Sequence, residues 1–498
     1  MMKQALSLPE QVVPPRLNVL AAWLWGLVLL ALPVTSFRYM PSVFGGSVIR
    51  PLAFYPLALL GLVLLWLVWR YRLRRFPANL TPLVAFILVA LIATLFGALY
   101  TPLDLRGQSY LGQSLRAWAS LGVGLSFYFA AAWMNRTEEQ LRWSLKWLVA
   151  GLLLNAAWGG VQALALYTPI FEFSLIDRLQ ELFSLRGIHP TRLVGFAYEP
   201  SWLADTLLIL LLPWLVAALL TGHRVTRYRW LDGSLLTAGA ALLLLTFSRS
   251  GYAVAALALL LTVLFAGRRW LAAIWRWFLA PFQRSGITQN KATAYVSRFF
   301  ISLGLLGLLV TAAFLAVQNR YFATFLSLDL SGSLYDNFVT LNAGPRLAYS
   351  VAGYQVYSHY PLTGVGLGGV GLYLYNYLPD WSLGGLVEIA RRLSPDSLVI
   401  SNPKNLYVLL LAETGLMGFW IFMAYYLSIL GSIRRMLISN RGYLVYTGVA
   451  GLFIWLAVAF RNLTQDSLTF PVMWASLGII AGMACDLETN ASSKTTQE

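Results

Sequence analysis

The chain has 498 residues, of which 58% are hydrophobic and only 11% are charged. Soluble domains carry roughly 25% charged residues, so this composition excludes a soluble globular protein and predicts a polytopic helical membrane protein. The formal net charge of +16 would suit a nucleic-acid binder. Most of the basic residues, however, lie in connections between apolar runs, where they report membrane orientation, and we expect no nucleic acid as a partner. The single cysteine, Cys485, excludes an intrachain disulfide bond.

Twelve apolar stretches are long enough to cross a hydrocarbon core of roughly 30 Å. Because lipid cannot satisfy exposed backbone groups, we expect each stretch to be a helix and the fold to be all-α. The stretches lie near residues 17–36, 51–69, 80–100, 117–134, 145–167, 200–221, 231–247, 249–266, 297–318, 403–430, 442–461 and 466–485.

The distribution of Lys and Arg predicts the orientation of these spans. With the N-terminus inside, the inner connections hold the larger share of basic residues, so both termini are expected on the cytoplasmic side. Interleaved basic and aromatic residues predict an interfacial helix near 268–280. The expected organisation is a cytoplasmic N-terminus (1–16), a membrane domain of spans one to nine (17–318), a large outer loop (319–402) with helices near 346–359 and 383–393, spans ten to twelve (403–485) and a cytoplasmic tail (486–498).

Arginines on the outer side of the membrane are unexpected under this orientation bias, so their presence suggests a function. They are Arg192, Arg249, Arg346 and, more weakly, Arg320. Arg249 lies in the short turn between two spans, where Ser248 or its neighbour Ser250 can cap the next helix. A guanidinium beside the free N–H groups of a helix N-terminus predicts a phosphate site. The alternative for Arg249 is an anchor to lipid headgroups.

Two carboxylates belong to the sixth predicted span. Glu199 stands at its mouth, where it can either accept the N–H groups of that helix or orient and deprotonate a sugar hydroxyl. Asp205 is six residues deeper and is expected to be a second buried acid or the partner of an arginine.

The tenth span begins with an unusual charge. Asn402 and Pro403 are predicted to cap and open its helix, which places Lys404 at the positive end of the helix dipole. Glu413 follows well inside the apolar layer. The structural alternative is a Lys that reaches the interface and a Glu paired with a neighbouring span. The glycine-dense turn at 361–369 is weak evidence for phosphate binding, and its alternative is a hinge.

No metal or nucleotide site is predicted. The three histidines, His189, His223 and His359, lie in separate segments, and no paired-cysteine spacing, Walker loop or dinucleotide motif is present. We therefore expect no metal and no cofactor, and any reaction must use a substrate that is already activated when it reaches the outer face.

The order of several motifs resembles the O-antigen ligase and O-antigen polymerase superfamily of lipid-linked polysaccharide enzymes. These motifs are the Ser-Arg-Ser-Gly turn at 248–251, the entry to the outer loop at 344–347, the Pro-Leu-x-Gly-x-Gly turn at 361–366 and the tenth span. The resemblance covers about residues 190 to 430.

The tenth span matches the ligase pattern in part and departs from it at one residue. In the ligases this span has a His, then Asn, Ser or Gln, nine further residues and Gly-x-x-Gly. Here Asn405 and the glycines Gly415 and Gly418 fit that pattern, and Lys404 takes the place of the His. The stretch from Gly195 to Ala204 also resembles polymerases more than ligases, which favours a polymerase.

The resemblance implies a metal-independent, GT-C-like glycosyl transfer at the outer face of the bacterial inner membrane. A glycan leaves undecaprenyl diphosphate and joins a sugar hydroxyl. The implied partners are the undecaprenyl-diphosphate-linked oligosaccharide, the lipid bilayer, and flippase and chain-length regulator proteins. The residues assigned to catalysis are Arg249, Arg346, Glu199 and Lys404; those assigned to substrate binding are Arg192, Asn405, Ser248, Tyr407, Glu413 and His359.

Within this interpretation Arg249 and Arg346 stabilise the leaving diphosphate, Lys404 contacts phosphate and Glu199 is the candidate base. Two alternatives remain open. One is an O-antigen ligase that transfers the glycan to the lipid A core, and the other is a glycolipid transporter or flippase.

Overall fold

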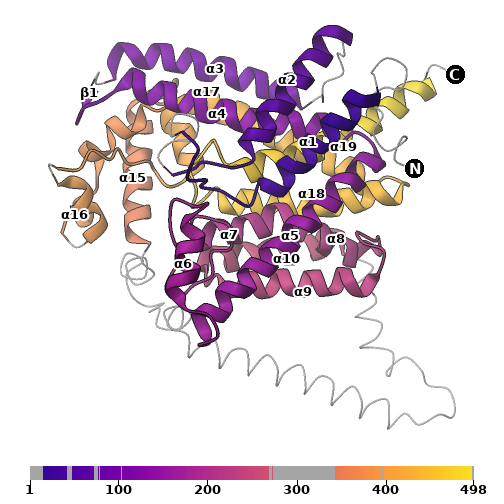
Figure 1. Ribbon diagram of the computed structural model, residues 1–498. Coiled ribbons are helices and arrows are strands. Elements are labelled where there is room, and N and C mark those ends of the chain that lie inside the picture. Colours follow the sequence, from indigo (N-terminus) through magenta and orange to yellow (C-terminus); the bar gives the residue numbers. More distant parts are fainter. Residues whose placement is uncertain are drawn as a thin grey trace, which may run out of the picture.

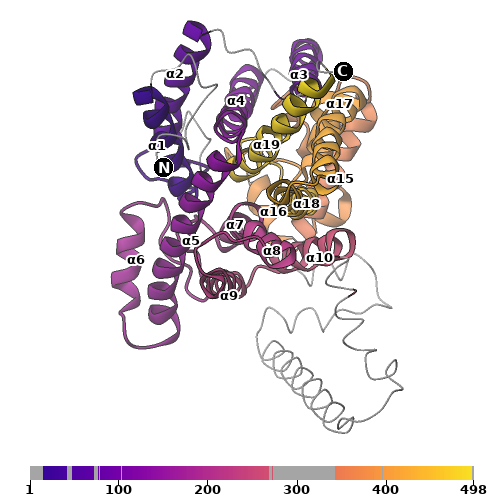
Figure 2. The ribbon, with the colours of Figure 1, turned by 90° about the vertical axis from the view of Figure 1, so that its right-hand side faces the viewer.

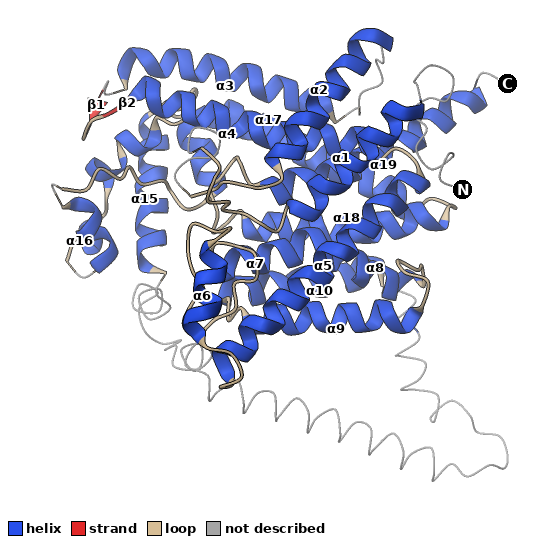
Figure 3. Ribbon diagram, in the orientation of Figure 1, coloured by secondary structure: helices blue, strands red, loops and turns tan. Residues whose placement is uncertain are grey.

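The computed structural model describes residues 15–41, 48–71, 77, 79–101, 104–267, 272, 343–384, 386–394 and 396–495. Within these ranges the protein is almost entirely helical (Figure 3). The single sheet of the described ranges is a short antiparallel hairpin, β1 (Asp104–Leu105) and β2 (Gln108–Ser109). The predicted all-α class is therefore confirmed.

Eleven of the twelve predicted spans are helical. They are α1 (Pro15–Ala31), α2 (Phe54–Tyr71), α3 (Leu80–Tyr100), α4 (Tyr110–Met134), α5 (Glu138–Tyr167), α7 (Pro200–Thr206) continued by the π-helix η2 (Leu207–Leu211) and α8 (Leu212–Thr221), α9 (Arg229–Leu245), α10 (Arg249–Ala266), α17 (Leu406–Leu437), α18 (Gly442–Arg461) and α19 (Pro471–Thr495). The predicted span at 297–318, Arg320 and nearly all of the predicted interfacial helix at 268–280 lie outside the described residues.

Length and hydropathy identify this chain as a membrane protein. Seven of the described helices are long and apolar enough to cross a membrane, and α1, α2 and the first part of α19 are shorter apolar helices. The protein is therefore polytopic, as its composition predicts.

The spans form one bundle, in which α18 lies between α17 and α10 and also packs against α8 and α19 (Figures 1 and 2). The smaller elements gather at one end of the bundle, which we call the loop end. They are α6 (Phe173–Glu181), α15 (Gly344–His359), α16 (Val387–Leu393) and the 3-10 helices η3 (Val370–Leu372), η4 (Leu374–Tyr377) and η5 (Asp380–Ser382). The helices predicted near 346–359 and 383–393 correspond to α15 and α16.

Aromatic side chains fill the middle of the bundle. Tyr128 of α4, Tyr425 of α17 and Trp474 of α19 are buried against one another, with ring centroids 5.8 to 6.2 Å apart. Gly124 allows this approach, because a Cβ there would lie 2.3 Å from the Trp474 ring nitrogen. Such packing contributes beyond the area that it buries.

One prediction about the tenth span is wrong. Its helix does not begin at Asn402 and Pro403: Asn405 is the N-cap of α17, and its side chain accepts from the backbone N–H groups of Tyr407 and Val408. The span is also not one continuous helix, because Gly415 has φ 64° and ψ −171°, values that only glycine adopts readily.

The glycine-dense turn packs into this break. Leu416 N donates to the carbonyl of Pro361 (2.8 Å), and Gly366 N donates to the carbonyl of Glu413 (2.9 Å). The buried Glu413 side chain is hydrogen-bonded to backbone N–H groups of Gly368 and Val370. The turn is thus a packed joint between the loop end and α17, and the hydrogen bonds of the Glu413 side chain help to hold this joint together.

Replacing Gly366 with Ala is expected to lower the melting temperature of the detergent-purified protein. Gly366 has φ 84°, and a Cβ there would lie 2.1 Å from the Tyr110 hydroxyl and 2.9 Å from Thr94 Cα. Overpacking costs about 1–3 kcal/mol, and the left-handed backbone adds about 1–2 kcal/mol for a residue with a Cβ. Gly384→Ala is the control, since nothing lies within 4 Å of its Cβ position. Equal melting temperatures for the two variants would contradict the role of the turn as a packed joint.

Candidate functional site

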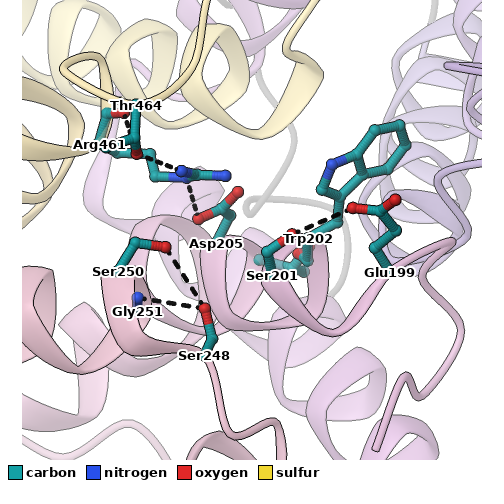
Figure 4. A network of polar contacts seen from close by, with 10 residues as sticks. Glu199, Ser201, Trp202, Asp205, Ser248, Ser250, Gly251, Arg461 and Thr464 are labelled. Carbon is teal, nitrogen blue, oxygen red and sulfur yellow. Dashed lines mark hydrogen bonds and ion pairs between the residues drawn. The ribbon is translucent and has the colours of Figure 1, made fainter. Parts of the chain in front are cut away.

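Polar side chains from separate helices meet at the loop end (Figure 4). Ser248 is the N-cap of α10 and is buried; its Oγ accepts from Gly251 N at 3.2 Å and lies 3.5 Å from Ser250 Oγ. A Cβ on Gly251 would lie 2.8 Å from Ala204 Cβ. The start of α10 therefore packs against α7, next to Asp205, which follows Ala204 in the sequence.

Asp205 forms a buried ion pair with Arg461 at the end of α18. Arg461 Nε lies 2.5 Å from Asp205 Oδ1, and each side chain is only 3% exposed. Arg461 Nη1 also donates to Thr464 Oγ1 at 2.5 Å. The structure thus supplies the arginine partner that the sequence predicts for Asp205, and it comes from a distant span.

Arg346 lies in the first turn of α15, directly after Pro345. Its side chain is exposed. Partial desolvation lowers the pKa of the Arg346 guanidinium, and repulsion from Arg461 lowers it further, while Glu199, Glu388 and Asp205 raise it. The ordinary pKa of Arg is so high that the group stays charged at neutral pH. Arg346 therefore belongs to the same electrostatic cluster as Asp205 and Arg461.

Glu199 stands at the N-cap position of α7, but its side chain does not cap the helix. Its carboxylate accepts from Ser201 Oγ at 3.5 Å and lies 3.7 Å from Arg186 Nη1, and it is 41% exposed. Of the two predicted roles, the structural one, acceptance of the N–H groups of α7, is not observed. The carboxylate remains accessible at the edge of the cluster.

Arg192 supports the turn that carries Arg249. Its Nε donates to the carbonyl of Thr246 at 2.9 Å, just after the end of α9. Thr246 Oγ1 in turn accepts from Ser248 N. This contact gives Arg192 a positioning role toward Ser248 and Arg249, in addition to the substrate contact predicted for it.

The protein itself supplies an anionic partner for Lys404, the carboxylate of Asp466. The backbone N of Lys404 donates to Asp466 Oδ2 at 3.0 Å, and its Nζ lies 4.0 Å from the same oxygen. Lys404 precedes α17 and has a left-handed φ of 60°, so it is not in the first turn of the helix. A phosphate is therefore not needed to explain a cation at this position.

Other predicted substrate-binding residues make structural contacts. Asn405 caps α17, and the Tyr407 hydroxyl donates to the carbonyl of Ala459 at 2.9 Å. Leu406 N donates to the carbonyl of Asn462, which brings the start of α17 beside Arg461.

His359 and Glu413 lie apart from the cluster. His359 ends α15, about 20 Å along the helix from Arg346 at about 1.5 Å per residue, and its Nδ1 contacts the carbonyl of Gln355. Glu413 is held in the joint at Gly415. Within the described ranges, no group of three or more His, Cys, Asp or Glu side chains could hold a metal ion.

Sequence reasoning missed Arg461, Asp466 and Arg186. Arg461 carries the same signal as the predicted arginines, since it ends a span on the side where basic residues are expected to be scarce. Asp466 follows five residues later in the same connection. Both could have been found by treating every charge near that end of a span as a candidate.

The fold and the cluster define a polytopic helical membrane protein with a group of charged side chains at one end of its bundle. Residues 234–423 match the family model described as O-Antigen ligase. This match confirms the resemblance to the O-antigen ligase and polymerase superfamily that the motifs predict. No curated protein matches the chain. The matched segment includes Ser248, Arg249, Arg346, Lys404 and Asn405.

Asn405→Ser and Asn405→Ala separate helix capping from substrate binding. Loss of the cap in Asn405→Ala should cost about 0.5–2 kcal/mol, whereas Ser retains a capping oxygen. If capping is the whole role, Asn405→Ser will keep both the melting temperature and the activity of the wild type. A stable Asn405→Ser protein that has lost product would instead assign Asn405 to the substrate.

Proposed function

We propose that this protein transfers a glycan from undecaprenyl diphosphate to a sugar hydroxyl and so polymerises a surface polysaccharide. The loop end would then face outward from the bacterial inner membrane, with both termini cytoplasmic. The observation that carries the proposal is the packing of the α10 start, which begins at Arg249, against α7 beside Asp205, whose charge acts on Arg346. The α10 start and Arg346 lie within the segment that matches the O-antigen ligase model, whereas Asp205 lies outside it.

The cluster suits a reaction whose leaving group gains negative charge. The acceptor hydroxyl oxygen attacks the anomeric carbon of the donor glycan, the bond from that carbon to the diphosphate oxygen breaks, and the diphosphate leaves with the electron pair. Arg249, Arg346 and the free N–H groups of α10 would stabilise this charge. Removal of one such preorganised donor typically lowers a rate by ~10²–10³.

Glu199 is the candidate acceptor of the hydroxyl proton. It is the accessible carboxylate of the cluster, whereas Asp205 is buried in its ion pair. A general base must first lie within hydrogen-bond reach of the proton that it accepts. Glu199 lies on the edge of the cluster, where an acceptor hydroxyl could approach it. Lys404 is fixed by Asp466, which favours a role as a fixed positive charge near phosphate over a role as the base.

Two sequence features favour a polymerase over a ligase that acts on the lipid A core. Lys404 stands where ligases have a His, and residues 195–204 resemble polymerases. A transporter reading is less favoured, because transporters typically bind substrate at the membrane midplane between related halves. The charged cluster described above lies at the loop end instead.

Arg249→Ala is expected to lower the rate of glycan transfer by ~10²–10³ while the protein still reaches the membrane, because one stabilising charge is lost from the leaving diphosphate. Surface-glycan chain length in cells that carry the variant gives the readout. Arg434→Ala, an exposed arginine at the other end of α17, is the matched control. Normal chain lengths in Arg249→Ala would remove Arg249 from catalysis.

Purified protein with a lipid-linked oligosaccharide distinguishes the reactions. A ladder of repeats on a gel is the expected product of a polymerase. Transfer to a lipid A core acceptor would identify a ligase, and movement of the lipid without new bonds would identify a transporter. Either of these two results would overturn the polymerase assignment.

A further inference from the structure

We propose that Arg461 is an additional phosphate-binding residue of this site and that Asp205 is the positioning residue that holds it. The ligand class is a diphosphate. Its identification as the diphosphate of a lipid-linked glycan rests on the proposed function, whereas the preference for a phosphate anion rests on the contacts below.

The first argument is the cost of the ion pair. Both side chains are 3% exposed, and the removal of two charges from water usually costs more than their attraction returns. Apolar residues of similar size would hold α7 against α18 at least as well. A buried pair at this position is therefore poorly explained by stability alone.

The second argument is that the pair is incomplete. Asp205 uses Oδ1, while its Oδ2 is buried without a hydrogen-bond partner. Arg461 uses Nε toward Asp205 and Nη1 toward Thr464. The Nε contact is an ion pair without hydrogen-bond geometry, Nη2 makes no hydrogen bond or ion pair with a described residue, and Nη2 is not among the fully buried atoms that lack a partner.

The donor that remains on Arg461 is thus not fully buried, although the side chain as a whole is only 3% exposed. Figure 4 shows the guanidinium of Arg461 lying over the Asp205 carboxylate, with its end directed toward the side on which Trp202 lies. Asp205 and Thr464 contact two of the three guanidinium nitrogens of Arg461. A guanidinium fixed in this way presents its remaining N–H groups in one direction, which is how arginines recognise phosphate oxygens.

The third argument is charge. Arg346 and Arg461 are close enough to repel each other, and the nearby start of α10 adds the positive end of a helix dipole. Asp205 is paired with Arg461, Glu388 acts on Arg346, and Glu199 is shared with Arg186. A diphosphate between Arg346 and Arg461 would relieve the repulsion.

A charge swap tests the proposal with inorganic diphosphate. Wild-type protein in detergent should melt at a higher temperature as diphosphate is added at constant ionic strength, because a ligand that binds the folded state stabilises it. Arg461→Gln should weaken diphosphate binding at least about tenfold, the scale of one charge-assisted contact. The double variant Asp205→Arg with Arg461→Asp should regain the melting temperature without ligand and remain at least about tenfold weaker for diphosphate.

Full recovery of diphosphate binding in the swapped protein would overturn the proposal, since it would make the pair a structural contact. Thr464→Val provides a milder variant if the others fail to fold. It keeps the ion pair, releases Nη1 and should weaken diphosphate binding about threefold or more, with little change in melting temperature. Unchanged binding in Thr464→Val would also overturn the proposal.

Transfer assays separate this inference from the proposed function. In Asp205→Asn, we expect the KM for the lipid-linked donor to rise about tenfold, because Arg461 loses the group that orients it. Diphosphate binding that depends on Arg461, without glycan product for any acceptor, would refute the proposed function and support the anion site. Unimpaired transfer by Arg461→Gln would refute the inference and leave the proposed function standing.

Discussion

The backbone joint between α17 and the turn at 361–366 fixes the geometry of the loop end. Gly415 breaks the helix, and the free backbone groups on either side of the break bond to the turn. Unpaired backbone groups are costly inside a membrane protein, so the break and the turn depend on each other. The joint fixes the end of α15, and the bond from Ser350 to the carbonyl of Pro403 holds its middle. Arg346 is thereby brought to the charged cluster.

The same constraint explains why the site is built at helix ends. Helix starts leave N–H groups free, and the interior of the bundle cannot satisfy them cheaply. At the loop end Ser248 satisfies one N–H of α10, Asn405 satisfies two of α17, and the carbonyl of Asn462 satisfies that of Leu406. The positions of Arg249 and Arg346 in the first turns of α10 and α15 add cations where the helix dipoles are already positive, and nearby carboxylates offset part of the charge of Arg346.

Local sequence patterns predicted the spans, because length and hydropathy are local properties, and they singled out Arg249 and Arg346 by their position against the orientation bias. These patterns did not predict contacts between side chains that are far apart in the sequence. Asp466 is 62 residues from Lys404, and Arg461 reaches Asp205 from another span, so no spacing rule joins them. The start of α17 was misplaced for a related reason: Asn402 and Asn405 are equally good caps in sequence, and only the contact of Leu406 with Asn462 decides between them.

The site is assembled from two parts of the chain. The first lies within residues 234–423, which match the O-antigen ligase model, and it supplies Arg249 and Arg346. The second lies outside that match and supplies Glu199, Asp205 and Arg461. In the proposed reaction, the departure of the diphosphate needs the cations of the first part. The proposed base that orients the acceptor hydroxyl, Glu199, belongs to the second part. A comparison of ligases and polymerases should therefore begin with the residues of α7 rather than with the matched segment.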